Sequence, residues 1–462
     1  MVSDIELDTL PTIIRHSVQQ ISSSELKSPP DHSSISLDHS RLRSVASNQL
    51  GQETTTGASS AQQTKEQVIR ARAQFIVTCC CMFAIGFNDA SAGPLLPRMQ
   101  SVYQISFLIV SLLFIFACVG FILGACLNVL VSDHVTFGKL LVLCEEAMIA
   151  FMLAIPAPPF PVFVLGYFIN GIGSALQIAQ VNGYLVVMGH NVNLKVALSQ
   201  ASYGAGAFVA PLVATQFSAM RHWSFHYLVS LSMVTTNAFL TSAIFRLQTK
   251  EGRDCRAQLG LEAMEPETSE HSPFRQIMNL KSVHILAAFI FLYVGTEVTI
   301  GGWTVTYIIQ QRDAGARSGY IASGFWGGIL LGRIILIPLN NWLGDRLVMM
   351  IYIVLAIGLE IVVWLVPSLI GNAVAVSLVG LFFGPMFPVA LSASRKVIPR
   401  WIYTGAIGWI TGIGQAGSAA LPFLTGALAD AVGISSLQPL LVGMMSAMIA
   451  MWLLVPRPTR PD

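Results

Sequence analysis

Long apolar runs dominate the chain from residue 75 onward, and they restrict its fold more than any other feature. A helix needs about 20 apolar residues to cross the hydrocarbon core of a bilayer. Charged residues make up only 11% of the chain, against about 25% in an ordinary soluble domain. We therefore predict an all-α membrane protein with twelve transmembrane helices. The expected spans are residues 75–97, 106–131, 138–157, 160–187, 195–219, 223–245, 283–309, 318–338, 347–367, 370–394, 404–430 and 434–455.

The distribution of lysine and arginine gives the expected orientation. If the amino terminus is cytosolic, most basic residues fall in cytosolic flanks, as membrane proteins prefer, and only four arginines fall outside. Residues 1–73 are polar and rich in serine, so we expect a disordered cytosolic tail rather than a cleavable signal peptide. Both termini are expected in the cytosol, and the plasma membrane is the expected location.

The spans divide into two comparable sets of six. Residues 246–282 form the expected cytosolic central loop between an amino-terminal bundle, 74–245, and a carboxy-terminal bundle, 283–456, with a short cytosolic tail, 457–462. Asp89 precedes Gly93 by four residues, and Glu297 precedes Gly301 by four, at matching places in the first and seventh spans. Parallel matches of this kind indicate an internal repeat, as in many transporters.

Asp89 and Glu297 are the acids for which a proton-coupling role is expected. An ionised side chain at bilayer depth costs at least about 2.5 to 3.5 kcal/mol, so it persists where it faces a cavity or has a function. Dehydration favours the neutral carboxylic acid, and each acid can therefore take up a proton on one side and release it on the other. The alternative is that either acid is a fixed acceptor for neighbouring hydroxyl or amide groups.

Neutral polar and aromatic side chains inside the spans are the candidate solute ligands. Amides without an inward lysine or arginine cluster favour a hydroxyl-rich or amide-bearing solute over an anion. Amides also hold helices together in membranes, and tryptophans also pack in cores, so these alternatives stay open. The candidates are Asn88, Asn170, Gln177, Gln180, Gln200, Tyr203, Trp303, Trp326 and Gln415.

Two further intramembrane charges are harder to place. We expect Arg333 to extend its charged head toward the cytosol, with pairing to an acid across the two halves as the alternative. Glu360 is open to three interpretations: a paired acid, a protonated acid, or a shifted helix boundary.

Several classes of function are excluded. "GIGQAG", residues 412–417, has dinucleotide-fingerprint spacing but follows an apolar helix rather than a strand, so helix packing explains it better. No Walker-type loop, GxSxG motif or zinc spacing occurs. Six of the seven cysteines lie in apolar runs, where disulfides are not expected. We expect no enzyme activity, cofactor, metal or nucleic-acid partner; the expected partners are a small-molecule substrate, protons and the lipid bilayer, and the chain is expected to be a monomer.

Several phrases resemble the major facilitator superfamily, and more specifically a fungal branch related to fucose permeases. They are "GFNDASAGPLLPRMQ", "GIGSALQIAQVNGY", "SYGAGAFVAPLVATQF", "YVGTEVTIGGWTVTYI", "FGPMFPVALS" and "GWITGIGQAGSAALPFLTGALAD". The resemblance implies secondary transport by alternating access between two six-helix halves. It also implies that the loop signature "VSDHVTFGK", with Asp133 and Lys139, and its counterpart "LGDR", with Asp345 and Arg346, pin helix ends across the interface of the two halves in one conformation.

This sequence departs from the family pattern at two places. His134 stands where the signature usually has arginine, and Gln200 stands where the resemblance leads one to expect histidine. Three interpretations therefore stay open: a proton-coupled permease for a sugar-like solute, an efflux transporter of a secondary metabolite, and a non-transporting nutrient receptor on the same scaffold. The direction of transport is not predicted.

Overall fold

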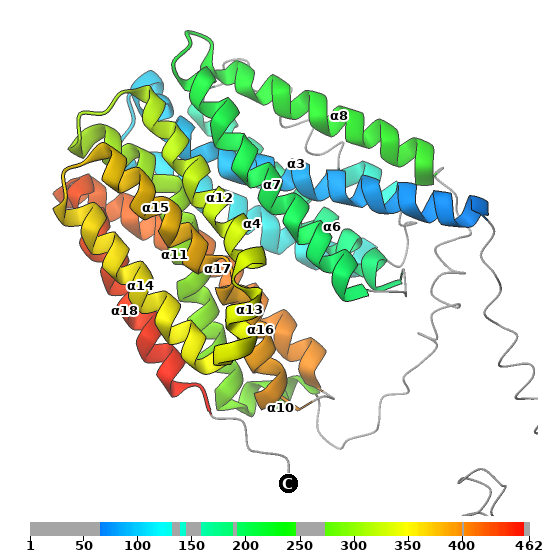
Figure 1. The fold of residues 1–462 in the computed structure, drawn as a ribbon. Helices are drawn as coiled ribbons and strands as arrows, with labels where there is room; N and C mark the ends of the chain where they lie inside the picture. The colour runs from blue at the N-terminus through cyan, green and yellow to red at the C-terminus, as the bar shows by residue number, and fades with distance from the viewer. Residues whose placement is uncertain are drawn as a thin grey trace, which may run out of the picture. The chain divides into compact units, whose positions relative to one another are not determined.

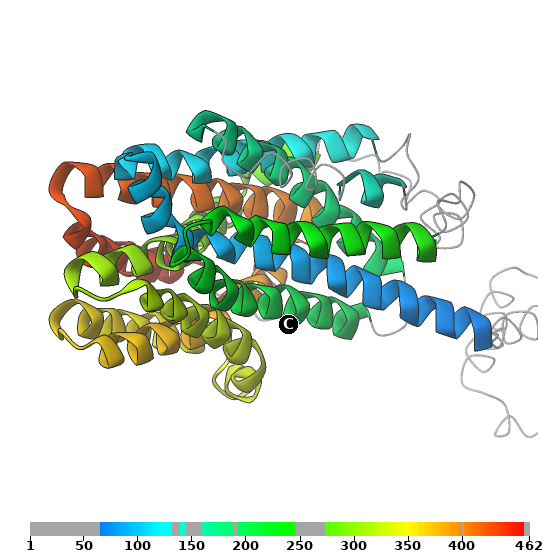
Figure 2. The same cartoon turned by 90° about the horizontal axis from the view of Figure 1, so that it is seen from above.

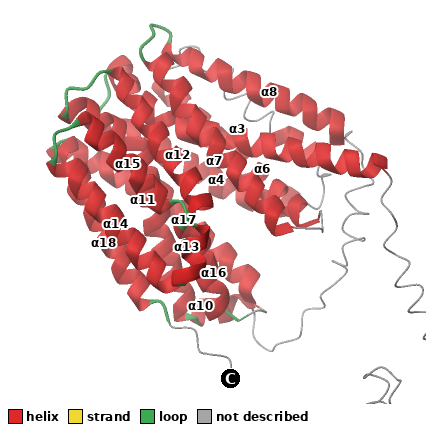
Figure 3. Ribbon diagram, in the orientation of Figure 1, coloured by secondary structure: helices red, strands yellow, loops and turns green. Residues whose placement is uncertain are grey.

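The computed structural model describes residues 65–131, 139–144, 159–187, 192–245, 273–399 and 402–456. Within these ranges every regular element is a helix and no strand occurs (Figure 3). In the part of the first half that the structure describes there are five long helices: α3 (Lys65–Tyr103), α4 (Phe107–Val131), α6 (Phe160–Val187), α7 (Val192–Ser218) and α8 (His226–Phe245). The all-α membrane fold class predicted from the sequence is therefore confirmed.

The second half contains more, shorter elements because glycine and proline interrupt its spans. Its helices are α10 (Pro273–Asn279), α11 (Lys281–Gln311), α12 (Tyr320–Ile335), α13 (Ile337–Leu343), α14 (Asp345–Leu365), α15 (Leu369–Phe383), α16 (Met386–Val397), α17 (Tyr403–Val432) and α18 (Leu437–Leu454). Two 3₁₀ turns accompany them, η4 (Ala316–Gly319) and η6 (Ile434–Ser436), and a third, η3 (Trp223–Phe225), precedes α8 in the first half. Pro385 follows the end of α15 and precedes α16, so the predicted tenth span is divided into two helices.

Twelve spans were predicted, and the described residues account for most of them. Nine helices are long and apolar enough to cross a bilayer, and Arg317–Ile335 with Ile337–Leu343 forms a further span bent by 56°. The eleventh predicted span is a 30-residue helix, α17, whose glycine-rich sequence keeps it out of that set. Most of the third, 138–157, lies outside the described residues. The first helix begins at Lys65, within the segment predicted to be a polar tail.

Glycines allow the closest helix contacts in the first half. At Gly86 a Cβ atom would meet the backbone carbonyl of Tyr203, and at Gly206 it would meet that of Phe83. Contacts of this kind require the bare backbone of glycine, because any side chain would push the helices apart. They hold α3 and α7 together backbone to backbone, and this fixes the position of Tyr203 relative to the middle of α3.

Among the described residues, helices of the two halves meet mainly as α3 with α11, α4 with α17, and α7 with α12. Outside these pairs, α8 runs beside α3 in both views (Figures 1 and 2). Elements far apart in the sequence are thus adjacent, as an internal repeat predicts.

The two halves touch mainly toward one end. We call this the closed end; the opposite end, where α3 and α11 begin and α18 finishes, is the terminal end. The contacts between α7 and α12 extend from a hydrogen bond between Gln216 and Tyr320, at the closed end, to the place where Gly204 packs against Leu330. Beyond that level Leu198 is 46% exposed.

On α12, Ile334 beyond that level is also exposed, at 56%. Figure 1 shows the beginning of α3 far from α10 and α16. The halves therefore diverge toward the terminal end.

Candidate functional site

Asp89 occupies the middle of α3, and its side chain is exposed although the residues on either side of it, Asn88 and Ala90, are buried. The hydroxyl of Tyr203, on α7, donates a hydrogen bond to Asp89 Oδ2 over 2.9 Å. No salt bridge to Asp89 occurs among the described residues. The carboxylate thus has one hydrogen-bond donor and an open face, at a depth where most side chains of α3 are packed.

Glu297 lies at the matching place on α11, but its surroundings differ. It is only 8% exposed. The hydroxyl of Tyr293, one helical turn earlier, donates to the backbone carbonyl of Phe383 on α15 over 3.3 Å, and it also interacts with Glu297 and with Arg333 on α12. Arg333 also interacts with Glu297 electrostatically. The second acid therefore lies in a group of three side chains that contains its own cation.

The two acids belong to one central region. Tyr203 interacts electrostatically with Asp89, with Glu297 and with Arg333. Four helices, α3, α7, α11 and α12, therefore bring two acids, two tyrosines and one arginine together where the halves meet. Such an arrangement can exchange protons and can reorient hydrogen bonds toward a solute, because each acid has a hydroxyl donor beside it.

A contact between glycines closes this region on one side. A Cβ atom at Gly93 would collide with the backbone carbonyl of Gly301. Each of these glycines follows its acid by four residues, which is about one helical turn. The acids therefore lie one turn from this glycine contact, on the side of it that leads to the terminal end.

The amides on α6 divide into those near Asp89 and those that join helices. Asn88 donates to Asn170 Oδ1 over 3.1 Å, and both are buried. Gln180 donates to Asn128 of α4 over 2.6 Å, which is the helix-joining alternative given above. Gln177 is fully buried. The Asn88–Asn170 bond joins α3 to α6 one residue before Asp89, and contact of this pair with a solute stays a prediction.

The aromatic candidates are packed in this conformation. Trp303 is fully buried, and its indole N–H donates to the carbonyl of Pro422 over 3.0 Å. Trp326 covers Gly301, is 8% exposed, and its buried N–H makes no hydrogen bond to the described residues. Ligand contact by either ring stays a prediction.

The remaining candidates lie on α7 and α17. Gln200 is half-buried. Gln415 donates to Ser418 Oγ over 3.1 Å, and its carbonyl accepts from Cys118 of α4. Gln415 therefore lies at the junction of α4 and α17, where the halves meet.

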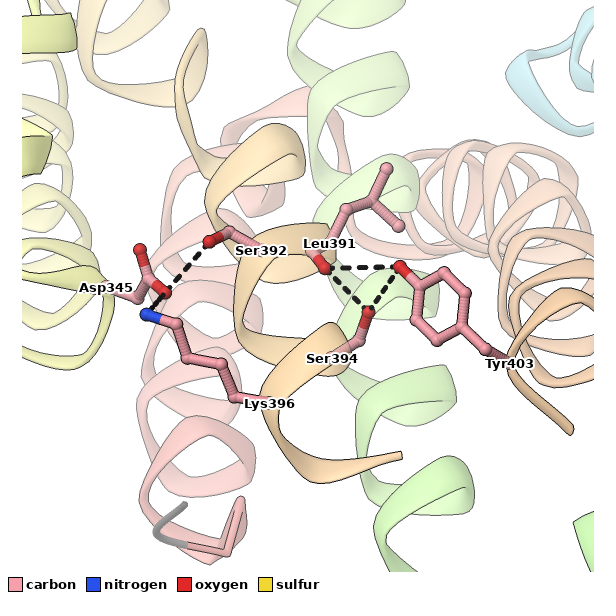
Figure 4. Close-up of polar contacts among 6 residues, drawn as sticks. All are labelled: Asp345, Leu391, Ser392, Ser394, Lys396 and Tyr403. Atoms are coloured by element: carbon pink, nitrogen blue, oxygen red, sulfur yellow. Dashed lines mark hydrogen bonds and ion pairs between the residues drawn. The ribbon is translucent and has the colours of Figure 1, made fainter. Parts of the chain in front are cut away.

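The predicted gating residues of the second half make contacts inside that half. Asp345 Oδ2 accepts from Lys396 over 2.6 Å and from Ser392 over 3.0 Å, which ties the start of α14 to α16 (Figure 4). Arg346 donates to the carbonyls of Val455 and Leu453 at the end of α18. Pinning across the two halves was expected from the resemblance; here both residues pin helix ends within the second half.

The first copy of the signature is mostly outside the described residues. Asp133 and His134 fall in the gap at 132–138. Lys139 lies just beyond that gap and is exposed. Its role stays a prediction.

Sequence reasoning missed Tyr293 and the position of Arg333. Residues four apart on a helix face each other, so Tyr293 was detectable as the i−4 neighbour of Glu297. Arg333 fits neither of the two alternatives given above in full, because it interacts with an acid, Glu297, that belongs to its own half. That contact depends on how α11 and α12 pack, and helical spacing alone does not reveal it.

Glu360 is fully buried on α14, and neither of its oxygens has a hydrogen-bond partner among the described residues. The helix is formed as predicted, which rules out a shifted boundary. Tyr307 on α11 interacts with it electrostatically.

Comparison with known proteins agrees with this architecture. The sequence model of the Major Facilitator Superfamily matches residues 78–399. The chain belongs to the Major Facilitator Superfamily. It is accordingly an integral membrane transport protein, and the suspected family is confirmed.

Individual members of the superfamily show how far the likeness extends. The chain is 25% identical over 410 residues to "Bypass of stop codon protein 6" of Saccharomyces cerevisiae, covering 83% of this chain and 82% of that protein. It is 24% identical over 384 residues to a glucose/galactose transporter of Brucella abortus, covering 76% and 86% respectively.

Solved structures of the superfamily share the fold at low identity. The nucleoside transporter NupG superposes with a TM-score of 0.65 at 14% identity, covering 83% of this chain and 97% of that one. FucP in its outward conformation gives 0.55 at 15% identity, with 84% and 100% covered.

Proposed function

We propose that this protein couples the movement of a neutral, hydroxyl-bearing solute of monosaccharide or nucleoside size to the movement of protons. The accessible Asp89 carboxylate, held by Tyr203 in the middle of α3, is the observation that carries the proposal. The neighbouring Asn88–Asn170 pair offers amide donors and acceptors that suit hydroxyl groups. The names of the Brucella abortus relative and of NupG support a solute of this class.

Each central group has a role in this proposal. Asp89 takes up and releases the proton, because it has an open face. Tyr203 holds the carboxylate and senses its protonation, since a neutral Asp89 gains an O–H that can donate to the Tyr203 oxygen, whereas the ionised carboxylate can only accept. Glu297, with Tyr293 and Arg333, provides hydrogen bonds for the solute from the second half. Alternation between the two open states follows from rocking of the halves about the contacts of α4 with α17 and α7 with α12.

In the proposed orientation the terminal end faces the cytosol. The conformation described above is then open to the cytosol, and Asp89 exchanges its proton there. The reverse conformation requires the Gly93–Gly301 contact to part and the terminal ends of α7 and α12 to meet.

Reconstitution into vesicles tests the proposal. The full-length protein is assayed with an imposed pH gradient and radiolabelled D-glucose, D-xylose, L-fucose and uridine, beside Asp89→Asn and an empty-vesicle control. We expect gradient-driven accumulation of at least one of these solutes, which Asp89→Asn abolishes, while solute exchange without a gradient continues. Accumulation that survives Asp89→Asn would remove the acid from coupling.

Export of an apolar metabolite is the second candidate, and Gln200 favours it because an uptake feature expected from the resemblance is altered there. The same vesicles distinguish the two. An exporter moves apolar compounds, and not the sugars, away from the terminal side in exchange for protons that enter from the opposite side. A receptor moves none of the compounds but binds one of them.

A further inference from the structure

A cavity lies on a face of the α3–α7 pair other than the one that carries the acids. It has a volume of about 500 Å³ and is formed by α3, α7 and α8. That volume is within the range of about 300–1,000 Å³ typical of small-molecule sites. Ile76 borders the cavity and is 60% exposed, so the cavity reaches the outer surface of the helices.

The cavity is separate from the proposed translocation site. Backbone contacts at Gly86 and Gly206 close the space between α3 and α7. Ser202 lines the cavity, whereas the next residue, Tyr203, bonds to Asp89. Adjacent residues point about 100° apart on a helix, so the two side chains serve different faces of α7.

The lining is apolar at both ends and polar in the middle. Phe75 and Leu240 lie at one end, and Phe83 and Met233 at the other. Between them lies Asn237, which is 4% exposed and whose side-chain Nδ2 makes no hydrogen bond to the described residues. A buried amide donor without an acceptor is costly, which is why such groups are normally paired.

The hydroxyl groups around Asn237 do not supply that acceptor. Ser232 donates to the carbonyl of Val229, Thr236 to that of Ser232, and Ser202 to that of Leu198. Each hydroxyl is thereby fixed to its own helix. The residues that line the cavity include no Asp, Glu, Lys, Arg or His, and its occupant is therefore uncharged.

The depth of Asn237 decides between an ordinary lipid and another molecule. It lies eleven residues from the start of α8 and eight from its end, which correspond to about 16 Å and about 12 Å along the helix axis. This is close to the middle of a hydrocarbon core about 30 Å thick. A lipid whose headgroup remains at the surface places only its acyl chain at this depth, and an acyl chain has no hydrogen-bond acceptor.

We propose that the cleft between α3, α7 and α8 is a binding site for an uncharged, mainly apolar small molecule that enters from the bilayer and carries a carbonyl or similar acceptor oxygen near its middle. On binding, the Asn237 amide turns so that Nδ2, which is buried against protein in this structure, donates to that oxygen. The apolar ends lie against Phe75 with Leu240 and against Phe83 with Met233. The site does not depend on the direction or the coupling of transport.

Benzophenone is the probe, because it is apolar at both ends, has a central carbonyl oxygen, and attaches to neighbouring C–H groups under near-ultraviolet light. The full-length protein in phosphatidylcholine nanodiscs is irradiated with benzophenone, digested and mapped by mass spectrometry. We expect adducts concentrated on the α3 and α8 peptides that line the cleft.

Three variants make the test specific. Asn237→Leu keeps the side-chain size and removes the donor, and it should lower the cleft adduct about five-fold, the effect of losing one neutral hydrogen bond. Thr241→Val removes a buried hydroxyl one turn away, outside the cleft, and should leave the adduct unchanged. Ala205→Phe fills the cleft and should abolish the adduct.

Thermal unfolding midpoints of the variants are measured in parallel. If Asn237→Leu does not fold, Ala205→Phe decides whether the cleft is the site. Adducts spread evenly over membrane-facing helices overturn the proposal. So does a cleft adduct that Asn237→Leu leaves intact, which would identify an acyl-chain site instead.

Discussion

The surroundings of the two central acids differ more than their sequence positions do. Asp89 has an open face, a tyrosine from a neighbouring helix and no salt bridge among the described residues. Glu297 is buried, with a tyrosine from its own helix and an arginine from the next. The same place in the two halves thus holds one acid without a cation and one acid with a cation.

This difference indicates a division of labour. A carboxylate beside a cation holds its charge and its geometry, because removing either partner leaves the other uncompensated. A carboxylate with one hydroxyl donor and an open face can change its protonation with little rearrangement. We therefore assign the movable proton to Asp89 and a fixed hydrogen-bonding role to Glu297.

Replacement of the acids should give the largest effect. Asp89→Asn should lower gradient-driven accumulation about 100-fold, because an amide of the same shape cannot carry a proton and a coupling free energy of this kind is worth up to about 3 kcal/mol. Glu297→Gln should retain coupling but bind solute more weakly. Radiolabelled solute flux in vesicles, with and without a pH gradient, measures both. Equal loss of coupling in the two variants would contradict the division of labour.

Removal of the cation should be the next largest effect, and it should fall on stability. Arg333→Met leaves Glu297 buried without its cation and should lower the free energy of unfolding by about 2 kcal/mol, less than for a fully buried pair because Arg333 is half-buried. The double variant Glu297→Gln/Arg333→Met should recover at least half of that loss. Denaturation in a detergent titration provides the free energies. Strictly additive losses would show that the two residues are not coupled.

Alanine substitutions at Gly93 and Gly301, the glycines that follow the two acids, should also have unequal effects. A Cβ atom at Gly93 meets backbone, whereas one at Gly301 meets the ring of Trp326, which can move. Gly93→Ala should therefore open the closed end and increase alkylation of an introduced Ser111→Cys about ten-fold, the effect of about 1.4 kcal/mol of overpacking.

Gly301→Ala should increase that alkylation less. Gly358→Ala is the matched control, because a Cβ atom there meets nothing within 4 Å. Equal alkylation rates in the Gly93 and Gly358 variants would show that the glycine contact does not hold the end closed.

The tyrosines should give the smallest effect. Tyr203→Phe removes the hydrogen-bond donor that Asp89 has and should reduce the initial rate of gradient-driven flux about five-fold. Tyr293→Phe should reduce it about two-fold, since Arg333 remains beside Glu297. Tyr352→Phe, which loses a bond to Asn340 away from the acids, is the control. A larger loss of flux in Tyr293→Phe than in Tyr203→Phe would contradict the assignment of the movable proton to Asp89.

Most of the fold was predictable from the sequence because each apolar run long enough to cross a bilayer has few alternatives to a helix. The acid-before-glycine spacing in the first and seventh spans also predicted two equivalent positions, and both glycines take part in the contact near the acids. The division of the tenth span at Pro385 was not predicted, since a continuous apolar run conceals a local break.

The candidate site was less predictable. The side chains on one helix face follow from spacing, so the approach of Tyr293 to Glu297 belongs to a pattern visible in the sequence, whereas the bond of Asn88 to Asn170 joins two helices. The hydrogen bond from Tyr203 to Asp89 and the approach of Arg333 to Glu297 depend on how separate helices rotate and cross. Whether Gln180 met a solute or a neighbouring helix was likewise decided by packing, here with Asn128.

The meeting of Gly93 with Gly301 has a consequence for the speed of the conformational cycle. Where two helices join through bare backbone, no rotamer has to be found again each time they separate and return. The joint is made of short-range dispersion contacts, which lose about a quarter to a half of their energy when the backbones part by about 0.5–1 Å. We therefore expect the Gly93–Gly301 contact to open and close without side-chain rearrangement when the two halves rock as rigid bodies.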